Sequence, residues 1–315
     1  MLAHCLQSQI ADHQPHGGVV PEIAARAHLH LLPQLIKQAL KQANISWNDI
    51  TAVAATAGPG LIGGILVGAM TAKAIAAALQ KPFIAVNHLE GHALTVRLTH
   101  AINFPYLLLL VSGGHTQFLI VHDVGHYEYL GGTIDDAVGE AFDKIAQLLS
   151  LDYPGGPLVE KIALKGDPQR FSFPRPLMGK PDCNFSFSGL KTAVRLQIEK
   201  LPALTEQDKA DIAASFQAAI ADCLLDRTAR AFALAPHIDQ FVIAGGVAAN
   251  AYLRERLQKL CQEHRKDFIM PPMALCTDNA AMIAWTGFER LQKGLTDDLS
   301  FSPRPRWPLK ELSTS

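Results

Sequence analysis

Apolar and polar positions along the 315 residues of this chain follow two different periods. Short continuous apolar runs predict buried strands, and stretches with apolar residues three and four positions apart predict helices. Strands are predicted at residues 50–57, 82–86, 106–111, 116–121, 127–130, 240–244 and 268–270, after an alternating, strand-like run at 2–10. Helices are predicted at 21–43, 60–79, 134–150 and 207–234, and from residues 88, 250 and 278 onward. Because helices separate most of the strands, the pattern predicts an α/β fold with a mixed or parallel sheet.

Three stretches depart from this alternation. Residues 60–79 are long and apolar enough to be weighed as a membrane span, but Lys73 near their middle would cost about 2.5–3.5 kcal/mol in a bilayer. The many Gly and Ala residues there predict instead a helix packed closely inside a globular protein. Residues 152–182 are rich in Pro and Gly, which predicts loops around a short helix, and the tail at 302–308 is too rich in proline for a core element.

Glycine turns follow two of the predicted strands. Gly58-Pro59-Gly60 and Gly245-Gly246 each stand between a strand and a helix, where backbone N–H groups and the helix dipole favour a phosphate. Either turn alone is a weak signal, because tight turns need glycine anyway. Together with Gly113-Gly114 between two further strands, in an apparently duplicated chain, they favour a nucleotide cleft between two similar domains. The sequence contains no G-x-x-x-x-G-K-[ST] phosphate loop.

Composition narrows the class of protein. The chain is 49% hydrophobic and 18% charged, so it can bury a substantial core. A formal net charge of −1 argues against a broad basic surface for nucleic acid, while an RNA held by a local patch or by a partner protein stays open. The 5 cysteines are scattered and form no C-x-x-C pair, which is typical of a reducing cytosol. The N-terminal residues show no signal-peptide pattern.

A histidine pair stands directly after the strand predicted at 82–86, in Asn87-His88-Leu89-Glu90-Gly91-His92. In a helix, residues four apart lie on one face, so both imidazoles can reach one divalent metal ion. Two solvated histidines on a helix are the alternative that the spacing alone leaves open. Asp278, at the start of a later predicted helix, offers a third ligand. Two His and one Asp with open positions is the ligand number of a reactive metal site and not of a closed structural one.

The same residues exclude a zinc protease. In H-E-x-x-H the glutamate is next to the first histidine and acts as base on the water bound to the metal. Glu90 is two residues from each histidine, about 200° around the helix from either, so it points away from the metal. The order H-x-x-E-H does not fit either, because Gly91 occupies its glutamate position.

Several longer motifs are distinctive in combination. They are Gly58-Pro59-Gly60-Leu61, Val86-Asn87-His88-Leu89-Glu90-Gly91-His92, Val111-Ser112-Gly113-Gly114-His115-Thr116, the stretch from Asp135 to Lys144, Tyr153-Pro154-Gly155-Gly156-Pro157, Phe185-Ser186-Phe187-Ser188-Gly189-Leu190-Lys191-Thr192, the stretch from Gly245 to Asn250 and the tail from Pro303 to Leu309. Together they resemble the TsaD (also called Gcp) family, the tRNA N6-adenosine threonylcarbamoyltransferases, in its bacterial branch. The resemblance runs from about Leu2 to the tail. The family was once described as O-sialoglycoprotein endopeptidases, and the position of Glu90 argues against that older description.

The resemblance implies the duplicated two-domain α/β fold of actin, Hsp70 and the sugar kinases (ASKHA). It implies an N-terminal domain at 1–102 with the histidine pair and a C-terminal domain at 103–315 with the substrate residues, while a helix at 278–295 packs back on the first. Family members begin with two further strands joined by a phosphate turn, and this chain lacks them. Their loss would leave helix faces uncovered and backbone groups unpaired, so a misassigned start is the hypothesis, with a fragment or a degraded copy as alternatives.

The activity that the resemblance implies is an acyl transfer in tRNA modification. Family members move a threonylcarbamoyl group from threonylcarbamoyl-adenylate to N6 of adenosine 37, in tRNAs that read codons beginning with A, and release AMP. The resemblance implies that His88, His92 and Asp278 bind one metal ion, iron before zinc. It also implies a cytoplasmic protein, with no membrane, that works with a paralogous partner subunit and a small P-loop ATPase.

Substrate contacts are likewise carried over from the resemblance. It implies a loop for the phosphate end of the adenylate at Val111, Ser112, Gly113, Gly114 and His115, and contacts to its nucleoside at Asp143, Gly156 and Asn250. The alternatives are that Asp143 is an ordinary carboxylate on a helix face and that Gly156 is a turn glycine, neither of which binds a ligand. A metal ion and the backbone N–H groups at Gly113-Gly114 would stabilise the charge of the leaving phosphate.

The catalytic residue itself stays unknown at this stage. The sequence identifies no general base, since the one family-like candidate, Glu22, is equally suited to a helix N-terminus. Two other function classes remain open, a sugar-kinase-like phosphotransferase and a non-catalytic scaffold such as the partner subunit of the same pathway.

Overall fold

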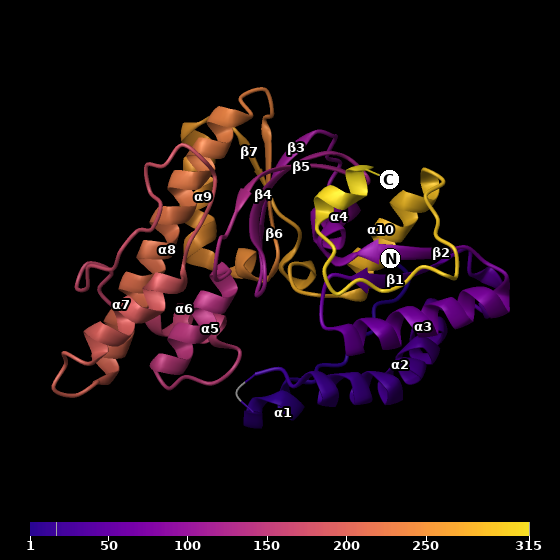
Figure 1. The fold of residues 1–315 in the computed structure, drawn as a ribbon, viewed down its shortest axis with the longest axis horizontal. Helices are drawn as coiled ribbons and strands as arrows, with labels where there is room; N and C mark the ends of the chain where they lie inside the picture. The colour runs from indigo at the N-terminus through magenta and orange to yellow at the C-terminus, as the bar shows by residue number, and fades with distance from the viewer. Residues whose placement is uncertain (17, 315) are drawn as a thin grey trace. The chain divides into compact units, whose positions relative to one another are not determined.

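The computed structural model describes residues 1–16 and 18–314, which form two compact units (Figure 1). The first unit contains Met1–Ala101, Asp123–Tyr127 and Asp278–Ser315, and the second contains Ile102–His122 and Glu128–Thr277. Their first boundary lies close to the predicted one at residue 102. The first unit also contains the chain from Asp278 onward, which includes the helix expected to pack back on it, and the short segment Asp123–Tyr127.

The first unit is built on a parallel pair of strands. β1 (Val53–Gly58) pairs with β2 (Phe83–Asn87), and α3 (Ile62–Leu79) makes the crossover that parallel neighbours need. Ile84 and Val86 of β2 pack against Met282 and Ile283 of α10 in a small core. The other elements of this unit are α1 (Ile10–His13), η1 (Gln14–His16), α2 (Pro21–Ala43), η2 (Trp47–Asp49), α4 (His88–Thr99), α10 (Ala280–Gln292) and η5 (Leu309–Thr314).

The free edge of β1 borders a large apolar cavity. Among the described residues no strand other than β2 pairs with β1. A cavity of about 970 Å³ lies beside it, between the N-terminal residues, α2, α3 and α10. The alternating run at 2–10, expected to be strand-like, is not a strand: residues 1–9 have no regular structure and Ile10 begins α1. Alternation alone is insufficient, because a strand exists only where a neighbour satisfies its backbone groups.

By length and composition α3 could cross a membrane, and 28% of its 18 residues are buried inside the structure. The expected packing inside the fold is therefore found on one face only. That face carries Ala69, Ala72 and Ala76, together with Lys73, whose ammonium group donates to the carbonyl of Phe301. Leu66 and Met70, which border this face, are exposed.

The proline-rich tail packs on the first unit even though it forms no strand. Trp307 is buried, and its carbonyl accepts a hydrogen bond of 2.8 Å from Nδ2 of Asn87. Arg304 N donates to Ala57 O at 2.7 Å, and Gly60 N donates to Pro305 O at 3.1 Å. The tail thus occupies the Gly58-Pro59-Gly60 turn, and the glycines of this turn allow the two backbones to pack closely. The turn therefore does not present a free phosphate loop.

The second unit contains a mixed sheet of five strands in the order β5-β4-β3-β6-β7. β3 pairs antiparallel with β4 and parallel with β6, and β6 pairs parallel with β7. The predicted strands are confirmed in number and position. Their bounds are β3 (Tyr106–Val111), β4 (Thr116–Asp123), β5 (His126–Gly132), β6 (Gln240–Ala244) and β7 (Asp267–Ile269).

Helices cover this sheet and bury its apolar side chains. Leu107 and Leu109 of β3 share one core with Phe142 of α5 and Phe216 of α8. The helix α7 (Ser188–Ile198) was not predicted. The others are α5 (Val138–Leu148), α6 (Gly155–Ala163), α8 (Glu206–Leu234) and α9 (Ala251–Glu263), with short turns η3 (Gly246–Ala249) and η4 (Met273–Leu275).

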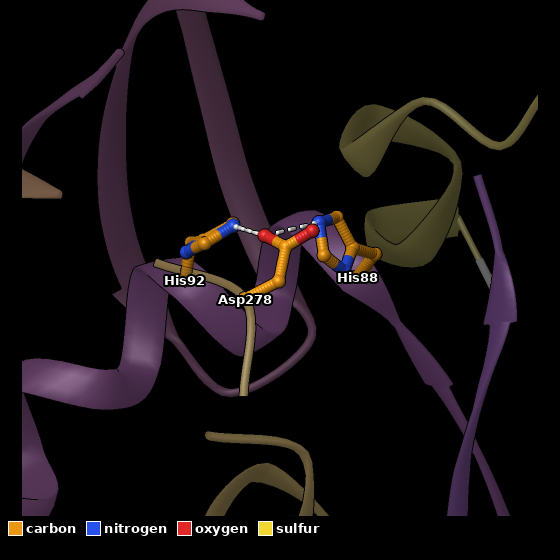
Figure 2. Close-up of side chains that lie close together, drawn as sticks. All are labelled: His88, His92 and Asp278. Carbon is orange, nitrogen blue, oxygen red and sulfur yellow. Dashed lines mark hydrogen bonds and ion pairs between the residues drawn. The ribbon is translucent and has the colours of Figure 1, made fainter. Parts of the chain in front are cut away.

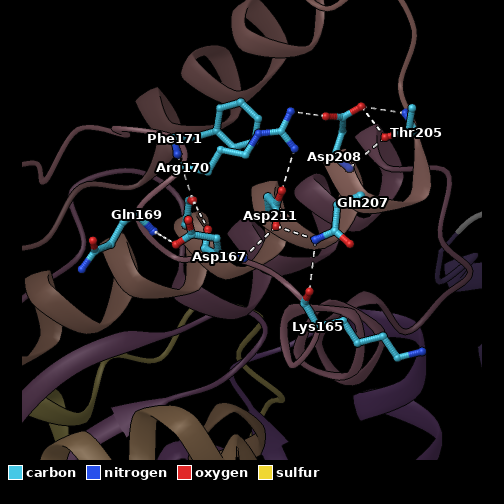
Figure 3. Close-up of polar contacts among 10 residues, drawn as sticks. Lys165, Asp167, Gln169, Arg170, Phe171, Thr205, Gln207, Asp208 and Asp211 are labelled. Carbon is cyan, nitrogen blue, oxygen red and sulfur yellow. Dashed lines mark hydrogen bonds and ion pairs between the residues drawn. The ribbon is translucent and has the colours of Figure 1, made fainter.

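The segment after α6 is fastened to the first turns of α8 by charged side chains (Figure 3). Arg170 Nη1 donates to Asp211 Oδ2 at 2.6 Å, and its other terminal nitrogen donates to Asp208. Asp208 also completes a capping box with Thr205, the residue that precedes α8. A segment predicted as loops from its composition therefore has a fixed conformation, because two buried carboxylates of α8 hold one arginine.

Candidate metal centre

The two histidines are presented by a strand-to-helix junction. β2 ends at Asn87, whose Oδ1 accepts a hydrogen bond of 2.9 Å from Leu89 N and so caps α4. α4 begins at His88, and His92 follows one turn later on the same face. Asp278 immediately precedes Asn279, the residue that caps α10. The two histidines therefore stand at the beginning of α4 and Asp278 stands just before α10, and both helix ends are capped by asparagine side chains.

The three side chains meet in the first unit, although 186 residues separate His92 from Asp278 (Figure 2). Asp278 Oδ1 lies 3.1 Å from His92 Nε2 and 3.4 Å from His88 Nε2. The two imidazoles are arranged edge to face, with ring centroids 4.8 Å apart. One potential ligand atom from each residue lies within 4.8 Å of the other two, which is close enough to hold one metal ion. The arrangement fits a divalent ion that binds two nitrogens and one oxygen and keeps further positions open.

Exposure differs among the three side chains. His92 is 1% exposed, His88 is 22% exposed and Asp278 is 77% exposed, so the site opens to solvent on the side of the carboxylate. Desolvation by the surrounding protein would raise the pKa of Asp278, but hydrogen bonds to the two histidines outweigh it and lower the pKa. Because the carboxylate is largely exposed, these hydrogen bonds decide the direction. Asp278 is therefore an anion at neutral pH, as a metal ligand must be.

Glu90 is directed away from these ligands. Its Oε2 lies 3.1 Å from Arg290 Nη1, and its Oε1 accepts hydrogen bonds from Tyr127 Oη at 3.0 Å and from Gly125 N at 2.9 Å. A glutamate committed to these partners is not placed to act as base on a water at the histidines. The structure therefore confirms the orientation that the sequence predicted for Glu90, away from the two histidines.

The predicted phosphate loop is the turn between β3 and β4 in the second unit. Ser112 N donates to His115 O at 2.8 Å, and Ser112 Oγ accepts from His115 N at 3.1 Å. Side chains added at Gly113 or Gly114 would meet no atom of the described residues within 4 Å, so the backbone of the turn is uncovered. Val111 is buried as the last residue of β3.

Two glycines of neighbouring elements hold this turn closely. Gly139, in the first turn of α5, donates its N–H to Ser112 O at 3.2 Å. A Cβ at Gly139 would lie 2.6 Å from that oxygen, and a Cβ at Gly245 would lie 2.3 Å from Val111 O. Gly245 also has a φ of 96°, which favours glycine. The glycines of two distant motifs are thus explained by contact with one turn.

Asp143 and Gly156 also come together in the second unit. Asp143 Oδ1 accepts a hydrogen bond of 2.8 Å from Gly155 N, at the start of α6. Burial raises the pKa of Asp143, while hydrogen bonds from the N–H groups of Gly155 and Gly156 oppose the rise. A Cβ at Gly155 would lie 2.4 Å from the Ala146 Cβ, whereas one at Gly156 would meet no described atom within 4 Å. Gly156 is therefore open and Gly155 carries the packing constraint.

Asn250 has partners within the protein for both ends of its amide. Its Oδ1 accepts from Leu253 N at 2.9 Å, which caps α9, and its Nδ2 donates to Gln217 Oε1 at 2.9 Å. The side chain is 7% exposed. Gln217, Arg290 and Tyr127 were not singled out in the sequence, because no local pattern marks a residue whose partner is distant in the chain.

The chain is similar to known proteins over nearly its full length. The family described as TsaD, tRNA N6-adenosine threonylcarbamoyltransferase, matches residues 1–285. The protein of that description from Rhodospirillum rubrum is 61% identical over 315 residues, covering 98% of this chain and 87% of the relative. The one from Brucella anthropi is 60% identical over 321 residues, covering 99% of this chain and 89% of the relative.

Solved structures with low sequence identity share the fold. A full-length HypF in a phosphate- and nucleotide-bound form has a TM-score of 0.61 at 14% identity, covering 83% of this chain and 49% of that one. HypF from T. kodakarensis has a TM-score of 0.63 at 15% identity, covering 82% of this chain and 44% of that one. At such identities the likeness concerns the fold alone, and it confirms the predicted α/β architecture.

Proposed function

The chain belongs to the family of tRNA N6-adenosine threonylcarbamoyltransferases, and on that premise we propose that His88, His92 and Asp278 hold one divalent metal ion that the reaction uses. The activity is a transfer, the attachment of a threonylcarbamoyl group to N6 of an adenosine in tRNA. The relatives are threonylcarbamoyltransferases, which transfer an acyl and not a phosphoryl group, so the phosphotransferase and scaffold alternatives are set aside. The observation that carries the metal proposal is the convergence of the three ligand atoms within 4.8 Å.

The proposed ion is iron, with zinc as the second candidate. Two imidazoles and one carboxylate suit both metals, and neither is excluded by the donor set. When bound, a divalent ion with open positions supplies Lewis-acid stabilisation of negative charge on phosphate oxygens. His92 is almost completely buried and fixes one side of the site, while the exposed Asp278 leaves the other side accessible to a ligand from solution.

The proposed donor is threonylcarbamoyl-adenylate, held in the second unit. Its phosphate would accept hydrogen bonds from the backbone N–H groups at Gly113 and Gly114, where a ligand can approach without meeting a side chain. Its nucleoside would lie against Gly156, beside Asp143. Because the amide of Asn250 is used by Leu253 and Gln217, its proposed role is to shape the pocket wall by capping α9.

The proposed acceptor is adenosine 37 of tRNAs that read codons beginning with A. Its N6 amine attacks the carbonyl carbon of the donor; the new C–N bond forms, the C–O bond to the phosphate breaks, N6 loses one proton, and AMP leaves. Bringing the two substrates together lowers the entropic part of the barrier. The proposed setting is cytoplasmic, with a paralogous partner subunit and a small P-loop ATPase.

The test is a reconstituted reaction. The chain, with those partners, is incubated with threonylcarbamoyl-adenylate and unmodified tRNA, and the digested nucleosides are weighed by mass spectrometry. We expect threonylcarbamoyladenosine from the unaltered protein and its loss in His92→Ala. The matched control is His122→Ala, since His122 also pairs with a carboxylate, Glu128 at 2.9 Å, and is not one of the three proposed ligands. Product of equal amount from His92→Ala and His122→Ala would contradict the metal proposal.

A further inference from the structure

In the sequence of α4, the completely buried Glu90 lies between the two histidines that are proposed as metal ligands. Glu90 is 0% exposed, and its neighbours Leu89, Gly91 and His92 are buried as well. Moving a carboxylate out of water costs several kcal/mol unless it is paired and hydrogen-bonded. The proposed transfer reaction gives Glu90 no role, because its side chain is directed away from the ligand atoms. Its burial therefore calls for an explanation of its own.

The partners of Glu90 come from two other elements of the first unit. Arg290 belongs to the last turn of α10, and Gly125 and Tyr127 lie at the turn between β4 and β5. Arg290 is 11% exposed, and its Nε has no hydrogen-bond partner in the described part of the chain. The ion pair with Glu90 is therefore the interaction that holds its guanidinium group. One carboxylate thus ties α4 to α10 across 200 residues of sequence.

The proposed metal site depends on how α4 and α10 lie against each other. α4 carries both histidines, whereas Asp278 stands at the beginning of α10. Gly91 lets the two helices approach closely, since a Cβ there would lie 2.9 Å from Ile283 Cδ1. Apolar contacts of this kind permit sliding, while a hydrogen-bonded ion pair fixes one register. A shift of α10 along α4 would carry Asp278 away from the histidines.

We propose that Glu90 is a positioning residue for the metal site, which through Arg290 fixes the register of α4 against α10 so that Asp278 meets His88 and His92. This inference rests on the proposed function, because it requires that these three residues bind a metal ion. It assigns Glu90 no contact with metal or substrate. A purely structural role would instead make Glu90 matter for folding and leave the metal affinity of the folded protein unchanged.

A second ion pair between the same helices provides the control. Arg97 Nε lies 2.7 Å from Glu289 Oε1, and Glu289 is 8% exposed. Arg97 is near the C-terminal end of α4, beyond both histidines, so this pair also links α4 to α10 but at a place remote from the ligands along that helix. Both pairs hold α4 against α10, so loss of either destabilises the fold. Loss of the Glu90 pair is expected to disturb the ligands more, because Glu90 belongs to the turn of α4 that carries both histidines.

The experiment measures binding of Zn²⁺ and Co²⁺ to the full chain, by competition with a chromophoric chelator and from the visible spectrum of bound Co²⁺. Glu90→Gln keeps the size of the side chain and removes its charge. We expect it to weaken Zn²⁺ affinity by about 10-fold, the lower end of the range for residues that hydrogen-bond to metal ligands directly, because Glu90 acts through the helices, and to alter the Co²⁺ spectrum. Glu289→Gln is expected to stay within about twofold of the unaltered protein and to keep its spectrum.

Further variants keep the test decisive. If Glu90→Gln does not fold, Tyr127→Phe removes one hydrogen bond to Glu90 and keeps the ion pair, and a smaller loss of affinity with a changed spectrum is expected. Equal affinities and spectra for folded Glu90→Gln, or for Tyr127→Phe, and the unaltered protein would overturn the positioning role. Failure of the unaltered protein to bind either metal would instead refute the metal site itself, so the two proposals fail in different ways.

Discussion

Asp278 Oδ1 lies 3.1 Å from His92 Nε2, although Asp278 precedes α10 and His92 belongs to α4. The pair joins α4 and α10, which pack side by side in the first unit. Removal of either member leaves two ligands, too few for the proposed site.

Metal binding is expected to stabilise the native chain. A ligand that binds only the folded state at 100 times its dissociation constant adds about 2.7 kcal/mol to the free energy of unfolding. We expect this gain with Zn²⁺ for the unaltered protein and no gain for Asp278→Ala, measured by urea unfolding. Asp298→Ala, which removes an acidic residue bonded to Ser300, is the control and should keep the gain. A Zn²⁺-dependent gain in Asp278→Ala would show that the ion binds elsewhere.

The carboxylate of Asp135 is expected to make stability depend on pH. It accepts hydrogen bonds from Phe187 N at 2.7 Å and Ser186 Oγ at 2.5 Å, next to the start of α7. Desolvation raises its pKa, but these hydrogen bonds outweigh it and lower the pKa of Asp135 to about 2. A lowered pKa in the folded state stabilises above the unfolded value and loses this effect as the pH falls through the folded value.

The measurement compares Asp135→Asn with the unaltered protein in urea unfolding from pH 7 downward. We expect Asp135→Asn to be less stable at pH 7 by about 1 kcal/mol, since Asp135 is exposed and solvent screens its interactions. The difference should shrink between about pH 4 and pH 2, where the carboxylate takes up its proton. A difference that stays constant over this range would mean that the charge of Asp135 contributes nothing.

Gly139 is expected to be irreplaceable because of the turn that it touches. A Cβ at Gly139 would lie 2.6 Å from Ser112 O, so Gly139→Ala should cost about 1–3 kcal/mol and displace the proposed phosphate turn. Gly189 holds the same second position in α7 that Gly139 holds in α5, and a Cβ there would meet no described atom within 4 Å. Gly189→Ala should therefore be neutral or stabilising by up to about 1 kcal/mol. Equal effects in thermal unfolding would contradict this account of Gly139.

Gly58 is expected to hold the C-terminal tail on the first unit. A Cβ at Gly58 would lie 2.0 Å from Arg304 O, so Gly58→Ala should detach the tail and speed tryptic cleavage after Arg306, the bond that precedes Trp307. Gly179→Ala controls for backbone strain, because Gly179 also has a positive φ, of 76°, but open space around it. Unchanged cleavage in Gly58→Ala would show that the tail does not depend on this contact.

Some residues of the proposed metal site could be predicted from the sequence, and others could not. The spacing of His88 and His92 identified a shared helix face, because helical geometry is local. Asp278 was added as a third ligand, and the resemblance carried the assignment. The partners of the buried Glu90, Arg290 and Tyr127, could not be identified from the sequence. The chain contains many basic and hydroxyl side chains, and no local pattern shows which of them lies next to Glu90 in the fold.

Local periodicity was enough to predict the strands of the second unit, α2 and the junction of β2 with α4. It also determined that Glu90 does not face the histidines, because 100° per residue is a property of any α-helix. Three outcomes emerged only from the folded chain: the tail belongs to the first unit, the Gly58 turn holds backbone and not phosphate, and residues 1–9 form no strand. Those outcomes depend on which distant backbone groups are available as partners, and hydrogen bonding between distant segments leaves no period in the sequence.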